Sequence, residues 1–390
     1  MVRPTVARVD LSAIQSNYRS IIDYVAAARG GERAPRVVAV VKANAYGHGG
    51  GEVARALEDA GADLLACADI EEGAALRNAG VRAEILVFGA LSVSALDGLF
   101  DCRLTPTIST PGAARAVQAA AVRHRQIVRY HLKIDTGMNR LGFRFDNLSR
   151  TLPDLMASGN LDLAGVYTHF ATADDPESKL FGEQRLRFEQ AFDFIRKNRG
   201  EHRTRRENLS SANSAVSSFE THAANSAALL RDSRVWYDRV RPGLLLYGIV
   251  PPPLASTVQL RPALSLVSRI VAVKGVRAGE GVGYGAKFKA EGPRAIAIVP
   301  AGYADGLDLR LSKGGAVLIR GRRAPIVGSV CMDMLMADVT ALDVSPGDEV
   351  VIIGSQGAER IDVREMAAQI GTIPWEILCR IGTRIERVYE

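Results

Sequence analysis

A lysine stands at the end of a buried strand, directly before a glycine-rich turn. Residues 36–41 are mostly β-branched and predict a strand with no exposed face, and Lys42 follows them. The turn that comes next is polar and contains Asn44, Tyr46, Gly47 and His48. An amine in this place fits a phosphate-binding loop, a lysine that holds a cofactor covalently, or an ordinary strand end whose lysine reaches water. The last is the commonest for a lysine considered alone.

Further polar side chains stand at or near the ends of other predicted strands. In a barrel of parallel strands, the active site is built where the C-terminal ends of the strands meet at one face. These residues would therefore lie around Lys42. Their proximity favours a functional role for this lysine over an ordinary solvated one. In chain order they are Lys133, Asp135, Arg140, His169, His222, Asn225, Ser226 and Arg241, and Gly243 offers its backbone nearby.

The first 245 residues alternate strand-like runs with helical patterns, several of which end on glycine. The predicted helices include residues 51–61, 70–80, 111–124 and 181–198. The predicted strands are residues 36–43, 63–68, 84–88, 103–109, 129–135, 162–170, 207–211 and 239–248. Eight strands with intervening helices predict a (β/α)8 TIM barrel over residues 11–245. An open doubly wound sheet is the alternative, because strand count alone does not prove closure.

The pattern changes at the proline-rich segment 251–256. Short alternating strands then follow, separated by turns rich in Gly, Pro and Asp, with one helix near residues 363–371. Residues 246–390 are therefore predicted to form a mostly β C-terminal domain. Residues 1–10 include a strand that could pair with either domain. The predicted strands after the boundary are residues 263–276, 294–300, 315–321, 324–330, 334–340 and 348–354.

The composition is that of an ordinary globular protein, with 47% apolar and 24% charged residues. No apolar run reaches the roughly 18 residues that a membrane span needs. The N-terminus lacks the apolar segment of a signal peptide. The four cysteines have no metal-binding spacing and are expected to stay reduced, which favours a cytoplasmic location. Cys331 beside Asp333 has no second cluster to support a metal, so no metal is predicted.

The net charge is +6, and much of the excess lies in the basic segment 196–207. That segment lacks interleaved aromatic residues. We interpret it as a solvated loop and expect no nucleic-acid site and no membrane contact.

A phosphate site in a barrel is commonly built by the loops after strands seven and eight. Ser226 and the backbone near Gly243 are the expected donors there. A phosphate opposite the amine of Lys42 indicates pyridoxal phosphate, which a lysine holds as a Schiff base. Arg241 would then meet the pyridine nitrogen. An arginine hardly ever gives up its proton, so the ring would be a weaker electron sink and quick return of a proton would be favoured over transamination.

Nine segments of the chain, in order, resemble the alanine racemases. They are RPTVARVDLSAIQSNY, AVVKANAYGHG, KIDTGMNRLGF, THFATAD, HAANSAA, VRPGLLLYG, VGYGAKF, AGYADG and VCMDM, and they span essentially the whole sequence. The resemblance implies a pyridoxal-phosphate enzyme that interconverts L- and D-alanine and supplies D-alanine for peptidoglycan. It also implies a small amino-acid substrate and a homodimer with shared active sites.

The resemblance assigns two catalytic residues. Lys42 would hold the cofactor and act as one base, and Tyr284 of a second subunit would be the opposite one. Racemisation removes a proton from one face and returns it on the other, so two flanking bases make chemical sense. A phenol is normally protonated at neutral pH and would need nearby cations, here Arg241 acting through His169.

The resemblance also assigns binding residues. Arg140, with Tyr303 and Met332 from the second subunit, would bind the substrate carboxylate, and Lys133 matches a lysine that is carbamylated in many family members. The phosphate would be held by Tyr46, Ser226, Gly243 and Leu244. The expected cofactor-binding residues in full are Lys42, Tyr46, Arg140, His169, Asn225, Ser226, Arg241, Gly243, Leu244 and Trp375.

Several positions depart from the family pattern or are ambiguous. Trp375 stands where a tyrosine is usual, and Leu309 and Ser329 stand where arginines are frequent, with Arg310 one position after Leu309. These departures leave the substrate range open. The motif ANSA occurs at 212–215 and 224–227; we assign the phosphate serine to Ser226 in the second copy, which follows a histidine and lies 15 residues before the arginine of strand eight.

Three other functions compete with this interpretation. A racemase of broader specificity would use the same scaffold. A barrel-type decarboxylase would pair a glutamate with the ring nitrogen, where this chain offers Arg241. A non-catalytic pyridoxal-phosphate carrier would resemble the barrel alone and would lack the β domain. The segment 279–285 echoes a GxGxxG loop but opens no helix, so Tyr284 is predicted to lie in a turn between two strands.

Overall fold

The computed structural model describes residues 3–29, 33–91, 96–207 and 219–390. The chain forms two compact units. The barrel unit consists of Gln15–Ala43 and Ala54–Leu260, and the β unit consists of Met1–Ile14, Asn44–Val53 and Arg261–Glu390. The boundary predicted between residues 245 and 246 stays a prediction.

Eight parallel strands close into a barrel. Each strand pairs with the next along the chain, and the last pairs back with the first, so the sheet has no free edge. The TIM-barrel prediction is confirmed, and the open sheet is excluded. The strands are β2 (Arg36–Val40), β3 (Leu64–Cys67), β4 (Glu84–Val87), β5 (Thr105–Ile108), β6 (Val128–Asp135), β8 (Leu161–Tyr167), β9 (Glu220–Asn225) and β10 (Arg239–Arg241), and the short β7 (Phe143–Arg144) extends β6.

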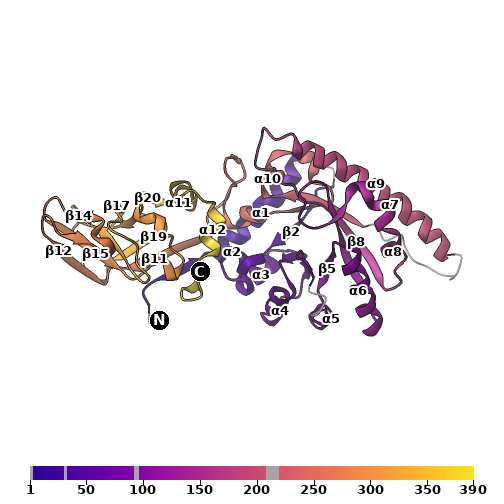
Figure 1. The fold of residues 1–390 in the computed structure, drawn as a ribbon, viewed down its shortest axis with the longest axis horizontal. Coiled ribbons are helices and arrows are strands. Elements are labelled where there is room, and N and C mark those ends of the chain that lie inside the picture. The colour runs from indigo at the N-terminus through magenta and orange to yellow at the C-terminus, as the bar shows by residue number, and fades with distance from the viewer. Residues whose placement is uncertain (1–2, 30–32, 92–95, 208–218) are drawn as a thin grey trace. The chain divides into compact units, whose positions relative to one another are not determined.

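Helices flank these strands (Figure 1). Sequence signals fix where several of them begin: the side chain of Asp69 accepts a hydrogen bond from the Glu72 amide, and Thr110 caps a helix whose first residue is Pro111. The helices are α1 (Leu11–Ala28), α2 (Lys42–Tyr46), α3 (Gly50–Asp59), α4 (Ile70–Asn78), α5 (Asp97–Asp101), α6 (Pro111–Arg123), α7 (Leu148–Thr151), α8 (Pro153–Ala157), α9 (Leu180–Glu207) and α10 (Ser226–Arg231).

The barrel strands are buried on both faces. Val38, Leu64, Ala66 and Leu86 form one apolar cluster, each at most 1% exposed. A parallel strand that contacts other strands inside and helices outside has no polar face, which explains the continuous apolar runs in the sequence.

The β unit is built mainly from short antiparallel strands. One sheet has the order β17-β16-β19-β11-β1-β21, with β20 beside β19; a second has the order β12-β15-β18, and β13 pairs with β14. The N-terminal strand β1 (Val6–Val9) therefore joins the C-terminal sheet, antiparallel to β11 and parallel to β21. The other elements are β11 (Leu264–Arg269), β12 (Ala272–Val276), β13 (Gly281–Val282), β14 (Phe288–Lys289), β15 (Arg294–Val299), β16 (Ala316–Ile319), β17 (Arg322–Pro325), β18 (Leu335–Asp338), β19 (Glu349–Gln356), β20 (Glu359–Ile361), β21 (Glu386–Tyr389), α11 (Val363–Ile370) and α12 (Pro374–Cys379).

Four sequence predictions of local structure were wrong. The seventh barrel strand is β9 and not residues 207–211; Glu207 ends α9, and residues 208–211 lie outside the described residues. The basic segment 196–207 continues helix α9 and does not form a loop. The apolar residues Leu244–Tyr247 form a 3-10 helix after β10. A second C-terminal helix, α12, was missed. In each case, tertiary context outweighed local pattern.

In the part of the chain that the structure describes, no helix is both long enough and apolar enough to cross a membrane.

A buried arginine ties four barrel strands together at their N-terminal ends. The Arg239 guanidinium is 5% exposed and lies 2.7 Å from both carboxylate oxygens of Asp63 and 2.5 Å from Glu220. Arg36 bonds to the same two carboxylates from β2. The network therefore joins β2, β9 and β10 to the start of β3.

Replacing Arg239 with leucine is expected to lower the free energy of unfolding by about 3 kcal/mol, near the low end for a broken buried ion pair because Asp63 remains 44% exposed. Urea unfolding followed by circular dichroism measures the loss. The matched control is Arg129→Leu, which removes a 60% exposed arginine of β6 that lies 3.5 Å from Glu84 of β4. It should cost less than about 1 kcal/mol. Equal losses in the two variants would contradict a special role for Arg239.

Candidate active site

Four positively charged side chains interact at the C-terminal ends of the barrel strands. Lys42, Lys133, Arg140 and Arg241 come from, or directly after, β2, β6 and β10. Lys42, Arg140 and Arg241 each lower the pKa of Lys133 through their charges. All four cations likewise lower the pKa of His169. The structure thus brings together the residues that sequence reasoning placed at one face. A concentration of positive charge in a partly buried site is suited to binding an anion.

Arg241 is buried, and its guanidinium is held in a fixed orientation. It donates to His222 Nδ1 at 2.9 Å, to the Thr168 carbonyl at 2.7 Å and to the Ala223 carbonyl at 2.9 Å, and it lies 3.4 Å from His169 Nδ1. Burial lowers the pKa of Arg241 to about 10, so it stays protonated at neutral pH. It is therefore a hydrogen-bond donor in this site and never an acid.

His222 connects Arg241 to a second buried histidine. Because a guanidinium only donates, His222 accepts at Nδ1; in its neutral form it carries its proton on Nε2, which lies 2.8 Å from His131 Nδ1. Burial lowers the pKa of His131 to about 3 and that of His222 well below its usual range. A Cβ on Gly165 would overlap the His131 ring, so this strand position requires glycine. Both imidazoles are neutral, and their tautomers are fixed.

His131 was missed by sequence reasoning. It stands two residues before Lys133 on the same strand, so both side chains point to the same face of β6. This two-residue spacing on a strand was the sequence signal that could have identified His131.

Lys133 is 5% exposed, and its amine lies 5.6 Å from the centre of the Tyr167 ring. Its pKa falls from the ordinary 10.5 to about 8, first because of burial and then because of the charges of Arg140 and Arg241. Asp135 offsets this only partly. A fraction of the amine is therefore neutral, and reactive, near neutral pH.

The Asp135 carboxylate organises the loop that carries Arg140. Its Oδ1 accepts backbone hydrogen bonds from Gly137, Met138 and Asn139 at 2.9–3.1 Å. This carboxylate therefore stabilises the loop, in addition to the charge interaction with Lys133 that the sequence suggests.

The residues predicted to hold a phosphate after strands seven and eight lie together. Ser226 Oγ accepts hydrogen bonds from the amides of Gly243 at 3.0 Å and Leu245 at 3.4 Å, and Leu244 opens the 3-10 helix between them. The Asn225 side chain caps α10 by accepting from the Ala228 amide. Ser214, in the alternative copy of the motif, lies outside the described residues.

Lys42 and Tyr46 stand at the two ends of α2, whose backbone is left-handed. The φ angles of Ala43, Asn44, Ala45 and Tyr46 are 52–53°. Left-handed helical backbone costs about 1–2 kcal/mol per residue with a Cβ. The turn is therefore strained and must be held by its surroundings.

At the start of this turn, the Glu72 carboxylate accepts from the amides of Ala43 at 2.6 Å and Ala68 at 2.8 Å, which fixes the ends of β2 and β3 together. Sequence reasoning missed Glu72. It is the N3 residue of α4, a helix position where carboxylates often accept backbone bonds, which was the available signal.

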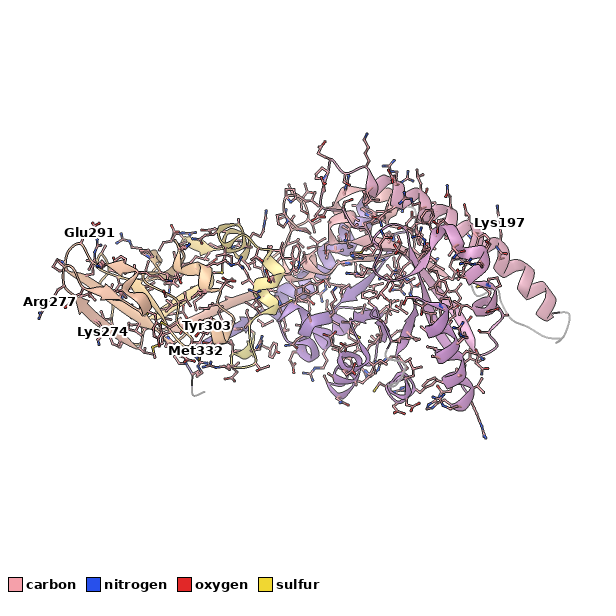
Figure 2. The ribbon with its side chains drawn as sticks, in the orientation of Figure 1. Lys197, Lys274, Arg277, Glu291, Tyr303 and Met332 are labelled. Carbon is pink, nitrogen blue, oxygen red and sulfur yellow. The ribbon has the colours of Figure 1, made fainter. Side chains whose placement is uncertain are left out.

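In the β unit, Tyr284 lies in the turn between β13 and β14, as predicted. The side chain is 73% exposed, while its carbonyl accepts a bond from Ser329 Oγ. Tyr303 and Met332, 46% and 53% exposed, lie close together (Figure 2) because the Tyr303 amide donates to the Cys331 carbonyl. The β unit therefore presents the three residues on its surface.

The positions that depart from the family pattern have definite surroundings. Leu309 is 53% exposed, whereas Arg310 bonds to Asp308 and to the Ile370 carbonyl at 2.7 Å. Arg310 thus bonds within its own domain and does not replace the arginine that the family often has at the position of Leu309. Trp375 is half-buried at the start of α12.

No cluster of three or more metal-binding side chains occurs within the described residues. A closed barrel with four cations at its active face, followed by a β domain, defines an enzyme of the barrel class that binds anionic ligands. Residues 9–251 match the alanine racemase N-terminal domain, and residues 263–389 match the alanine racemase C-terminal domain. The chain belongs to the alanine racemase family.

Relatives of known function and structure cover the chain from end to end. It is 41% identical to alanine racemase of Carboxydothermus hydrogenoformans, covering 100% of both chains, and 37% identical to that of Halothermothrix orenii, covering 100% of this chain and 98% of the relative. Among solved structures, alanine racemase of Clostridium difficile 630 matches with a TM-score of 0.88 at 32% identity, covering 100% of this chain and 96% of that one. The Bacillus anthracis enzyme with bound L-Ala-P matches with a TM-score of 0.87 at 33% identity and the same coverage.

This family depends on pyridoxal phosphate, and the donor set fits that cofactor. The amine of Lys42 suits its aldehyde, and the cations around Lys133 suit its negative charges. The buried Arg241 suits its ring nitrogen, because a permanent donor matches a nitrogen that accepts.

In cofactor-free protein, Lys133→Met should stabilise the fold in a pH-dependent way. The lowered pKa means that a protonated Lys133 opposes folding below about pH 8 and that this cost vanishes above about pH 10.5. The gain should be of the order of 3 kcal/mol at pH 7 and close to zero at pH 11. Chemical unfolding in bicarbonate-free buffer at both pH values measures it.

The control is Lys197→Met, which removes an exposed lysine of α9 (Figure 2). It should change stability little at either pH. A gain at Lys133 that persists undiminished at pH 11 would show that the effect is packing and not charge.

Proposed function

We propose that the protein interconverts L- and D-alanine with pyridoxal phosphate by a two-base mechanism, using Lys42 and Tyr284 of a second subunit. The observation that carries the proposal is the group of four cations around the end of β6, on a chain that matches alanine racemases along its full length. The D-isomer would serve peptidoglycan synthesis.

When bound, pyridoxal phosphate draws electrons from the substrate's α-carbon and makes its proton removable. Arg241 would limit that withdrawal. It could donate a hydrogen bond to the ring nitrogen but would keep its own proton, because its pKa is about 10 even when buried. Quick return of the proton to the α-carbon would then be favoured, and the amino group would stay with the substrate.

Two groups move the α-proton. Lys42 Nζ would hold the cofactor until substrate replaces it, and would then take or give the proton on one face. Tyr284 Oη would act on the other face. Its 73% exposure on its own domain is consistent with a side chain that serves another subunit.

His169 would orient the phenol. Arg241 lies at His169 Nδ1 and the pKa of His169 is well below its usual range because of burial, so the ring is neutral and presents an Nε2 proton. An N–H donated toward the oxygen of Tyr284 would favour its deprotonated form.

The remaining roles concern binding. Arg140, Tyr303 and Met332 would hold the substrate carboxylate, the last two from the second subunit. The phosphate and the rest of the cofactor would be held by Tyr46, Asn225, Ser226, Gly243, Leu244 and Trp375. The proximity of Ser226 to the Gly243 amide supports this assignment.

Lys133 would be carbamylated. With a pKa of about 8, roughly a tenth of the amine is neutral at pH 7 and can form an N–C bond with carbon dioxide, releasing a proton. The new negative charge would lie among Arg140 and Arg241 and fix the former toward the substrate. A modification of Lys133 that left it uncharged would not gain this attraction to the two arginines.

The second subunit would be a copy of this chain. Large apolar side chains that a monomer would leave in water gather in the part of the β unit that carries the proposed shared residues. They are Tyr284, Tyr303, Leu309, Met332 and Met334, each at least 46% exposed. The four cysteines, all of them described, form no disulfide, which supports a reducing, cytoplasmic location.

Optical rotation, followed with a panel of single-enantiomer amino acids, tests the activity. Alanine should racemise fastest, and Lys42→Ala should abolish both this activity and the visible absorbance of the bound cofactor. Comparable rates with lysine or serine would indicate the broad-specificity racemase that Leu309 and Trp375 leave open. Release of carbon dioxide from the substrate would indicate the decarboxylase.

Mixing two inactive variants tests whether the sites are shared between subunits. Lys42→Ala and Tyr284→Phe chains that exchange subunits should regain about a quarter of wild-type activity, because half of the dimers are mixed and each mixed dimer has one intact site. Mixing each variant with itself is the control. An absence of recovery, with subunit exchange verified by mass spectrometry, would place both residues of each site in one chain.

A further inference from the structure

We propose that His48 and Arg387 form a clamp that holds the left-handed turn between Lys42 and Tyr46, and that both are positioning residues for cofactor binding. The inference rests on the proposed function, in which Lys42 and Tyr46 contact the cofactor. It adds two residues to which that function assigns no role.

The turn needs external support. Four successive residues with a Cβ, Ala43 to Tyr46, have φ near +52°, a conformation that such residues rarely adopt even singly. None of the four is glycine, and only Asn44 is of a residue type that adopts this conformation more readily. Strained backbone of this kind persists only when surrounding contacts over-determine it.

His48 supports the turn from its C-terminal end. The ring is 1% exposed, and its Nδ1 lies 3.0 Å from the carbonyls of both Ala45 and Tyr46. A carbonyl only accepts, so Nδ1 carries the proton. Burial lowers the pKa of His48 to about 4, and the ring therefore remains a neutral donor throughout the physiological range.

Arg387 supports the next residue. Its Nε donates to the Gly47 carbonyl at 3.1 Å, and its two terminal nitrogens donate to the carbonyls of Gly382, Ile385 and Ile381 at 2.6–2.7 Å. The guanidinium thus joins the end of the turn to the loop before β21. β21 is itself fixed in the sheet by pairing with β1, where Arg387 lies opposite Ala7.

The surrounding backbone leaves the turn no alternative path. Gly47 and Gly49 both have positive φ, and a Cβ at either would overlap the Leu378 carbonyl or the Tyr389 hydroxyl. The Asn44 side chain closes the segment by accepting from the Gly50 amide at 2.7 Å. The clamp therefore fixes one backbone geometry for the residues that follow Lys42.

The test compares hydrogen exchange of residues 42–53 in cofactor-free protein with the affinity of each variant for pyridoxal phosphate. Exchange reports the turn without any cofactor, since the amides of His48, Gly49 and Gly50 are bonded within it. His48→Leu and Arg387→Met should each speed exchange in this segment and weaken cofactor binding by about tenfold or more, the usual effect of losing a buried hydrogen bond.

Two conservative variants and one control sharpen the comparison. His48→Asn keeps an N–H near the position of Nδ1 and should stay within about threefold of wild type, whereas Arg387→Lys keeps the charge but not the fork and should fall between. Arg8→Met is the control: it removes an arginine of the neighbouring strand β1 that bonds to Glu349 at 2.9 Å. It should leave exchange of residues 42–53 unchanged.

The outcomes separate the clamp from the proposed function. Unchanged exchange in His48→Leu and Arg387→Met, or faster exchange spread evenly over the whole β unit, would overturn the clamp. Equal effects of His48→Asn and His48→Leu would also overturn it, because the donated hydrogen bond would then be irrelevant. Failure of the wild-type protein to bind pyridoxal phosphate would instead refute the proposed function, while the exchange data would still decide the clamp.

Discussion

Repulsion among four cations is the constraint on which the active site depends. Closure of the barrel brings Lys42, Lys133, Arg140 and Arg241 to one face, and the burial of Lys133 and Arg241 reduces the screening of their charges by water. The site responds in two ways. The amine of Lys133 loses part of its hold on a proton, and the nearby histidines remain neutral. An anionic ligand therefore relieves the repulsion among the cations, whereas an apolar ligand does not.

The neutral histidines have a second consequence for the arginine at the centre. Arg241 has three firm acceptors, two of them backbone carbonyls and one an imidazole nitrogen, so its orientation is set without any carboxylate. A carboxylate in the same place would have cancelled its charge and competed with the cofactor for its hydrogen bonds. A histidine fixes the guanidinium and leaves its full positive charge to the ligand.

The sequence was most informative where one kind of pattern dominated. Apolar runs such as residues 36–41 predicted the barrel strands because both faces of each strand are buried. β9 was missed because its residues, ETHAAN, are small or polar and carry no β-branched run. The basic end of α9 resembles a solvated loop in sequence, because charged residues there obscure the helical periodicity.

The active site was also only partly predictable from the sequence. Lys42, Arg140 and Arg241 could be grouped from the positions of strand ends, but the left-handed turn could not be predicted from Ala-Asn-Ala-Tyr, which contains no glycine. Its support comes partly from Arg387, 340 residues away along the chain. Local propensity carries no information about a contact at that separation.

The place of β1 between β11 and β21 has a consequence for the order of events during synthesis. The sheet that anchors Arg387 is incomplete until residues 386–389 have left the ribosome, although Lys42 is made much earlier. The barrel strands can pair earlier, since none of them needs the C-terminal residues. The turn beside Lys42 reaches its final geometry only after residues 386–389 have been made, and a shorter nascent chain would therefore bind a cofactor weakly.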